Sequence, residues 1–276
     1  AAFIIGLIFL MDRFQRKRLL NKAKEKMKMQ EAELRAQAAE LQSKNAENLS
    51  KVIQAESERK TKELEEARQL QLSMLPRELP NLPNLDLAVY MQTATEVGGD
   101  YYDFHLSSDG TLTVAVGDAT GHGMQAGMMV TATKSLFESL GGELDTVAFM
   151  NKANSTIKQM HLEKLKMAFT LLKIQENKLY ASGAGMPALL IYRHATDNLE
   201  EISFEGMPLG SLANFPYEEK QVDLSSGDKI VIMSDGFPER QNPSGDMLDY
   251  AAAHDAILKS ANKSPQEIVE HLIKKG

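Results

Sequence analysis

Three short acidic motifs contain the residues best suited to chemistry. They are EVGGDYYDF (96–104), GDATGHG (117–123) and SDGFPE (234–239). Each places an Asp beside Gly: Asp100, Asp118 and Asp235. Asp118 and Asp235 each end an apolar run that predicts a buried strand, and Gly lets the chain turn sharply there. The carboxylates could meet at one edge of a sheet, or each could cap a turn, which Asp often does.

The available ligand types narrow the chemistry. The chain has no Cys, so disulfides and thiolate metal sites are excluded, and its six His are scattered. Carboxylates and backbone carbonyls remain, and they favour hard cations such as Mg²⁺ or Mn²⁺. Asp103 and His122 are secondary candidates. We expect His122, between two glycines, to shape the turn or contact a substrate rather than to bind metal.

Two motifs suggest other chemistry. GGDYY (98–102) is similar to the GGDEF motif of diguanylate cyclases, but Tyr101 stands where that family has an acidic residue. GAGMPA (183–188) has the spacing of a dinucleotide-binding loop. It precedes Pro187 and a strand rather than a helix, so the helix N-terminus that binds a pyrophosphate is missing. The cyclase is kept as an alternative function, and dinucleotide binding is discounted.

The order of expected elements indicates the fold class. Expected strands cover 85–92, 111–118, 167–174, 178–184, 188–193 and 228–235, and expected helices cover 123–140, 145–160, 246–261 and 264–276. Strands and helices do not alternate regularly, which argues against a doubly wound parallel sheet. Short connections predict hairpins between the strands at 167–193, and the apolar run 228–235 predicts a central, buried strand. We therefore predict an α+β fold of two mainly antiparallel sheets flanked by helices.

The N-terminal region has a different composition. Residues 1–11 are uninterruptedly apolar but fewer than the roughly 20 residues that span a bilayer, so we expect the tail end of a truncated transmembrane helix. Basic residues cluster at 13–18, and positive charge marks the cytoplasmic side of a membrane helix. We expect a cell-membrane protein whose remaining residues are cytoplasmic. The net charge of −7 and pI near 5.5 argue against nucleic-acid binding.

A long helix should follow. Residues 19–75 lack Gly and Pro and are rich in strong helix formers. Leu20, Met27, Leu34 and Leu41 recur every seven residues, so residues 12–75 are expected to form a helical stalk that dimerises as a coiled coil. A solvated single helix is the alternative. The Pro-rich linker 76–84 then leads into a domain at 85–276.

Five motifs in order resemble the metal-dependent protein phosphatase (PPM, type 2C) superfamily, in its SpoIIE/RsbU-type branch of bacterial serine phosphatases. They are EVGGDYYDF (96–104), VAVGDATGHGMQAGMMV (114–130), YASGAGMPALLIY (180–192), GMPLG (206–210) and IVIMSDGFPE (230–239). The segment ARQLQLSMLP (67–76) also resembles that branch. The resemblance covers about residues 67–276.

The resemblance implies an αββα sandwich holding two Mn²⁺ or Mg²⁺ ions. Asp100, Asp118 and Asp235 match the metal-binding aspartates, and the backbone carbonyl of Ala119 matches a further ligand. The implied reaction is hydrolysis of phosphoserine or phosphothreonine by a water activated between the ions. The implied substrate is a phosphorylated STAS-domain protein, an anti-sigma-factor antagonist, with the phosphatase as output domain of a membrane sensor.

Two departures from the family pattern matter. Met186 stands where members usually have His. The family's late Asp-Asp-apolar-Thr motif does not occur before Gly276, so we expect the domain to lack its last strand and one metal ligand, which would impair activity. The rival readings are therefore a pseudophosphatase that binds a partner and a membrane-tethered coiled-coil scaffold.

Overall fold

The computed structural model describes residues 2–92, 97–162, 164–240, 245 and 247–274, and only the backbone of residues 2–12. The chain divides into two compact units, Ala1–Lys62 and Glu63–Gly276. Because the boundary falls inside a helix, the last turns of that helix belong to the second unit. Each unit is described by itself below.

The helix is α1, Ala2–Ser73, and it confirms the long helical segment expected from the sequence. Ion pairs one turn apart stabilise its surface, such as Glu40–Lys44 and Glu47–Lys51. The side chains of Leu20, Met27, Leu34 and Leu41 are 61–70% exposed. The side chains of the proposed membrane segment, residues 1–11, lie outside the described residues. Within the described part of the chain, no helix is long and apolar enough to cross a bilayer.

The second unit contains two antiparallel sheets. The five-stranded sheet has the order β1 (Asp100–Leu106), β2 (Leu112–Ala119), β3 (Met167–Gln175), β4 (Lys178–Ala184) and β7 (Lys220–Asp223). The three-stranded sheet has the order β6 (Asn198–Ile202), β5 (Leu189–Arg193) and β8 (Lys229–Val231). Every pair of neighbouring strands is antiparallel.

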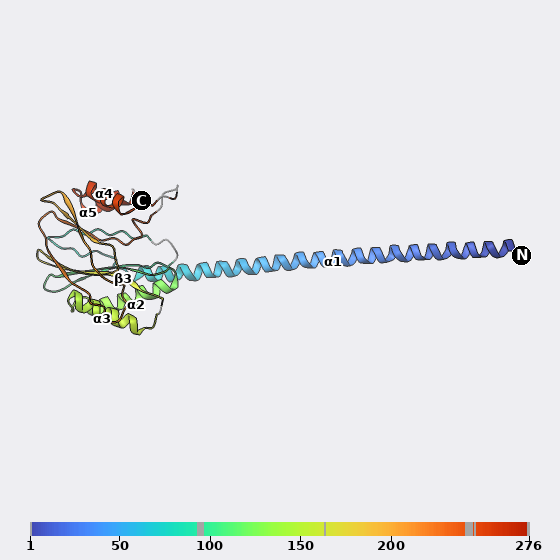
Figure 1. Ribbon diagram of the computed structural model, residues 1–276, viewed down its shortest axis with the longest axis horizontal. Helices are drawn as coiled ribbons and strands as arrows, with labels where there is room; N and C mark the ends of the chain where they lie inside the picture. Colours follow the sequence, from blue (N-terminus) through green and yellow to red (C-terminus); the bar gives the residue numbers. More distant parts are fainter. Residues whose placement is uncertain (1, 93–96, 163, 241–244, 246, 275–276) are drawn as a thin grey trace. The chain divides into compact units, whose positions relative to one another are not determined.

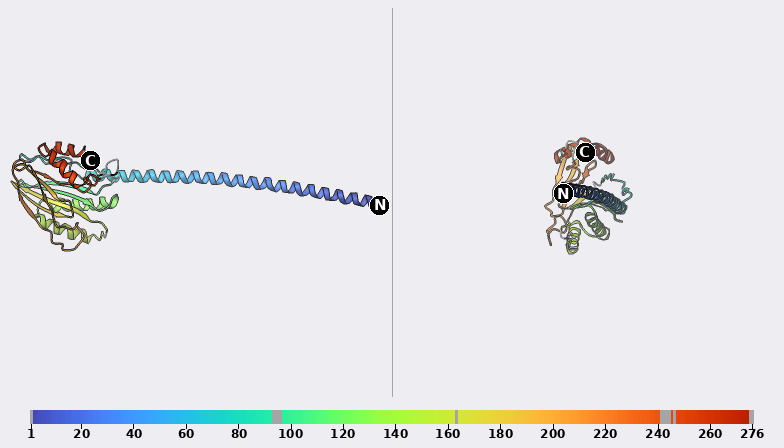
Figure 2. Two further views of the ribbon diagram at one scale, coloured as in Figure 1. Left: turned by 45° about the horizontal axis from the view of Figure 1, so that its top comes forward. Right: turned by 90° about the vertical axis from the view of Figure 1, so that its right-hand side faces the viewer.

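Helices cover both outer faces, as Figures 1 and 2 show. The helices are α2 (Met124–Leu140) and α3 (Thr146–Gln159) on the five-stranded sheet, and α4 (Tyr250–Ser260) and α5 (Pro265–Ile273) on the other side. Ser264 caps α5 through a capping box with Glu267, and Pro265 is the first residue of the helix. The predicted αββα arrangement of two antiparallel sheets and flanking helices is confirmed.

Two apolar cores hold these layers together, and alternation along the strands supplies both. On β3, Leu171 joins the core beneath α2 and α3, which also contains Phe137 and Phe149. The next residue, Leu172, points the other way and packs with Ile191 between the two sheets. The five-stranded sheet is therefore buried on both faces, which fixes its register and the positions of the residues at its edge.

Three sequence predictions about strands are wrong. Residues 85–92 do not form a strand: they pack Leu87 against the inter-sheet core without joining a ladder. The strand expected at 228–235 is only Lys229–Val231 and pairs with β5 alone among the described strands. Strands β4 and β5 do not form a hairpin, because the chain crosses between sheets at Gly185, whose φ is +78°.

Candidate metal centre

Asp100 and Asp118 meet at one end of the five-stranded sheet. Asp100 is the first residue of β1, and its partner across the ladder is Asp118 near the end of β2. Directly opposed residues on antiparallel strands have Cβ atoms roughly 4.5–5.5 Å apart and side chains on one face. The structure therefore brings together two carboxylates that lie 18 residues apart in sequence.

Asp235 reaches the same place from the other sheet. It follows β8 and opens a turn that closes with a hydrogen bond from the Glu239 N–H to the Asp235 carbonyl, at 2.9 Å. Burial, the largest cause, and the charges of Asp100 and Asp235 together raise the pKa of Asp118 to about 7. Burial also raises the pKa of Asp100; a hydrogen bond with Ser234 opposes this increase and the Asp235 charge adds to it. The three carboxylates thus repel one another in a partly desolvated site.

Gly99 allows the close approach of these groups. A Cβ at this position would lie 2.6 Å from the Ala119 carbonyl oxygen and 2.7 Å from Asp118 Oδ1. The Ala119 N–H also donates to the Gly99 carbonyl at 2.9 Å. Gly99 therefore packs directly against two of the four metal donors proposed from the sequence, and only a residue without a side chain fits there.

The preceding residue is held by α1. Gln71, only 3% exposed, donates from Nε2 to the Gly98 carbonyl at 2.8 Å and accepts from the Gly98 N–H at 3.1 Å. One side-chain amide thus satisfies both backbone groups of Gly98. The helix that precedes the domain therefore holds the segment that delivers Asp100. Sequence analysis did not assign Gln71 a role, although it lies within the matching segment 67–76.

The donors fit a hard divalent cation by their chemistry. They are three carboxylates and one backbone carbonyl, all oxygen ligands of the kind that Mg²⁺ and Mn²⁺ prefer. Their mutual repulsion is what a bound cation would relieve. Across the described residues, no three His, Asp or Glu side chains converge into a finished ligand group. The arrangement therefore gathers the donors without completing their coordination geometry.

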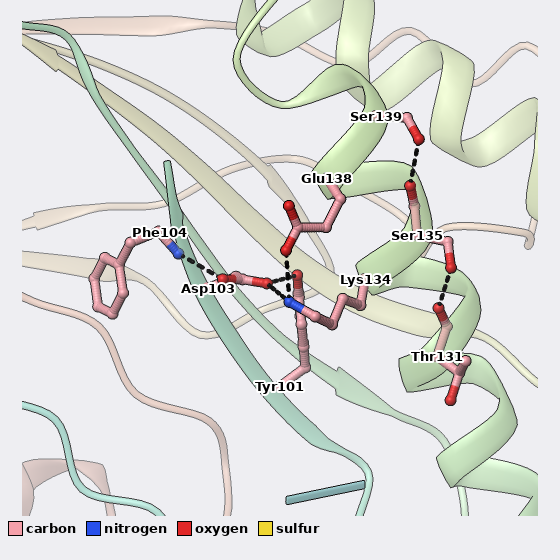
Figure 3. A network of polar contacts seen from close by, with 8 residues as sticks. All are labelled: Tyr101, Asp103, Phe104, Thr131, Lys134, Ser135, Glu138 and Ser139. Carbon is pink, nitrogen blue, oxygen red and sulfur yellow. Dashed lines mark hydrogen bonds and ion pairs between the residues drawn. The ribbon is translucent and has the colours of Figure 1, made fainter. Parts of the chain in front are cut away.

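Asp103 lies apart from this group. It is buried and accepts hydrogen bonds from Lys134 Nζ at 2.7 Å, the Tyr101 hydroxyl at 2.9 Å and the Phe104 N–H at 2.9 Å. Figure 3 shows Lys134 reaching from α2 to Asp103 on β1, with Glu138 on its other side. Because residues 100 and 103 are an odd number apart on one strand, their side chains point to opposite faces. Asp103 therefore links β1 to α2.

The remaining candidate, His122, is exposed in the loop between β2 and α2. Neighbouring Gly121 and Gly123 have φ of +88° and +73°, so the turn requires glycine on both sides. Two groups that the sequence analysis left out do approach the carboxylates. Burial raises the pKa of Tyr250, and the charges of Asp235 and Glu239 raise it further. Glu239, the final residue of SDGFPE, is the one that the motif could have suggested.

Comparison with solved structures defines the class of fold. The SiaA-PP2C domain of Pseudomonas aeruginosa superimposes with a TM-score of 0.65 at 19% identity, covering 79% of this chain and 89% of that one. The RsbU and RsbW domains of Rv1364c from Mycobacterium tuberculosis give 0.53 at 23% identity, covering 66% and 50%. The fold is therefore that of PP2C-type phosphatase domains.

Sequence comparison defines the family. The family model described as Stage II sporulation protein E (SpoIIE) matches residues 108–275, more than half of the 276-residue chain. The chain belongs to the SpoIIE family. It is 22% identical over 213 residues to phosphoserine phosphatase RsbU of Bacillus subtilis, covering 76% of this chain and 63% of the relative. Protein IcfG of Synechocystis is 23% identical over 242 residues, and the match covers 38% of its length.

Proposed function

We propose that this chain is a metal-dependent protein serine/threonine phosphatase and the output domain of a membrane-bound sensor. The observation that carries the proposal is the meeting of Asp100, Asp118 and Asp235 at one end of a PP2C-type sandwich. These residues come from three separate motifs and two sheets. Family membership supports phosphate-ester chemistry, since a relative is a phosphoserine phosphatase.

Asp100, Asp118, Asp235 and the carbonyl of Ala119 would hold two Mn²⁺ or Mg²⁺ ions. When bound, such ions activate water and neutralise phosphate oxygens during hydrolysis. The chain itself supplies the positions of the donors. Gly99 keeps the space beside Asp118 and Ala119 clear, and Gln71 fixes the backbone that leads to Asp100. The protein needs no nucleophile of its own, which agrees with the lack of Cys in the sequence.

The proposed substrate is a phosphorylated STAS-domain protein, and the proposed assembly is a dimer joined through α1. The exposed heptad residues Leu20, Met27, Leu34 and Leu41 support self-association, because a single helix cannot bury such a stripe alone. The Gln71 contacts support signal transfer, because they join the end of α1 to the segment before Asp100. The apolar segment 1–11 and the basic residues after it support attachment to the cell membrane, with the phosphatase domain cytoplasmic.

The test is metal-dependent turnover of p-nitrophenyl phosphate and of a phosphoserine peptide. Turnover should require Mn²⁺ or Mg²⁺, and Asp235→Asn should reduce it by more than about 100-fold, since a ligand outweighs the supporting groups whose loss costs 10–100-fold. Exposed Asp223→Asn, on β7, is the matched control and should leave turnover unchanged. If the full-length protein shows no metal-dependent turnover, the alternative of a pseudophosphatase that binds a partner is supported instead. GTP consumption would favour the cyclase instead.

A further inference from the structure

A cavity of about 320 Å³ lies between α4 and the outer face of the three-stranded sheet. The sheet side of the cavity is lined by Ala188, directly before β5, and by Leu190 on β5. Glu201 on β6 and Met233, which follows β8, complete this side. Glu201 is the ladder partner of Leu190, so both side chains emerge on the same face. Tyr250, Ala251 and His254 of α4 form the opposite wall.

The lining indicates what the cavity could accept. Pro187, Ala188, Leu190, Met233 and Ala251 make it mainly apolar. Among the described lining residues, the Nδ1 atom of His254 lies 3.1 Å from the Oε1 atom of Glu201, so these two polar groups satisfy each other. A volume of about 320 Å³ is at the lower end of the range for small-ligand pockets, so it suits one or two side chains better than a cofactor. An apolar side chain fits this lining, because no unpaired charge would have to be buried with it.

The cavity is next to the candidate metal centre. Met233 lies two residues before Asp235, a span of at most about 7 Å for extended chain. The other wall is tied to the same turn by backbone hydrogen bonds, from the Asp249 N–H to the Pro238 carbonyl and from the Leu248 N–H to the Arg240 carbonyl, both 2.9 Å. The cavity lining is therefore joined to the turn that carries Asp235, and the charge of Asp235 acts on Tyr250 in the cavity wall.

We propose that this cavity is a specificity subsite that takes an apolar side chain near the phosphorylated residue of a protein substrate. The proposal rests on the proposed phosphatase function and adds a determinant of which phosphoproteins are hydrolysed. Metal ions and the carboxylates recognise the phosphate alone. Selection among phosphoproteins needs contacts beyond the phosphate, and the cavity is placed to provide one.

The experiment uses the full-length protein with Mn²⁺ and a panel of phosphoserine peptides. The host peptide has Ala at the three positions on each side of phosphoserine, and one Leu replaces each Ala in turn. Leu at one position should raise kcat/KM about tenfold over the all-Ala peptide, the discrimination expected from burying one aliphatic side chain. The Leu/Ala ratio is internal to each variant, so a general change in activity cancels.

Two variants fill the cavity from opposite walls. Ala251→Leu and Ala188→Leu should each bring the Leu/Ala ratio close to one. Ala195→Leu adds the same side chain on an exposed turn outside the cavity and should keep the tenfold ratio. The subsite is overturned if no position responds to Leu, or if both cavity variants keep the preference. Failure of the phosphatase proposal is a different result, since neither p-nitrophenyl phosphate nor any peptide would then be hydrolysed.

Discussion

Substitution of Gly99 by Ala tests the geometry of the candidate metal centre most directly. The new Cβ would lie 2.6 Å from the Ala119 carbonyl oxygen, whereas ordinary contact begins near 3.4 Å. Either Gly99 or the Ala119–Asp118 segment must then shift by about 0.8 Å, the difference between these two distances. The contacting atom is backbone, so no side-chain rotation can relieve the overlap.

The shift should affect the metal site more than the fold. Overpacking typically costs about 1–3 kcal/mol, which for a domain of this size lowers Tm by about 2–4 °C per kcal/mol. A displacement approaching 1 Å in a catalytic constellation can cost about 100-fold in rate. We therefore expect Gly99→Ala to reduce Mn²⁺ affinity and kcat/KM for p-nitrophenyl phosphate by roughly 10- to 100-fold.

Calorimetric Mn²⁺ titration, phosphatase assays and thermal unfolding without metal measure these effects separately. Gly236→Ala is the matched comparison: it adds a methyl group beside Asp235, where the nearest other atom would be 3.6 Å away. It should cost far less than Gly99→Ala. Wild-type Mn²⁺ affinity and turnover in Gly99→Ala would refute the assignment of Ala119 and Asp118 as donors packed against Gly99.

Three further perturbations follow from contacts in the second unit. Gln71→Leu leaves both backbone groups of buried Gly98 without a partner, which costs about 1–3 kcal/mol for each group. The substitution should accelerate hydrogen exchange of the Gly98 amide and weaken Mn²⁺ binding. Unchanged hydrogen exchange at Gly98 would contradict this prediction. Lys134→Met leaves the Asp103 carboxylate buried without its cation and should lower the free energy of unfolding by about 3 kcal/mol in urea titrations, with Asp103→Asn restoring part of the loss. Burial alone would raise the pKa of Asp228, but hydrogen bonds from two backbone N–H groups and the Arg193 guanidinium hold it below its usual range. Because its pKa is lowered in the folded state, the ionised Asp228 carboxylate stabilises the fold above about pH 4, and this stabilisation is lost as the pH falls. Asp228→Asn should therefore lower the free energy of unfolding at pH 7 and lower it much less at pH 3. Equal losses at the two pH values would refute the prediction.

The layered fold and the meeting of the three aspartates could be predicted because each depends on strong local signals. An apolar run that ends in Asp next to Gly marks both a buried strand and a turn, as at Asp118. The position of Asp103 could also have been found, since period-two alternation places it on the face opposite Asp100. Its acidity alone was misleading.

Other features could not be obtained from pattern. Strands β6 and β7 have the sequences NLEEI and KQVD, which carry little apolar signal. Both lie at the edges of their sheets, where backbone hydrogen bonds on one side suffice and side chains remain largely solvated. Conversely, the apolar run around β8 predicted a central strand, yet β8 has β5 as its only partner among the described strands. Hydrophobicity reports burial of side chains and does not specify how many neighbours a strand has.

The N-terminal part of β1 is where separate parts of the domain act on the candidate centre. Gln71 of α1 holds Gly98, Gly99 packs against Ala119, and Asp100 pairs with Asp118. Asp103, three residues after Asp100 on the same strand, forms an ion pair with Lys134 of α2. Because this second anchor is independent of α1, movement of the last turn of α1 would displace residues 98–100 while the rest of β1 stays in place. A change at the end of α1 would thus alter the positions of the donors without unfolding the sheet.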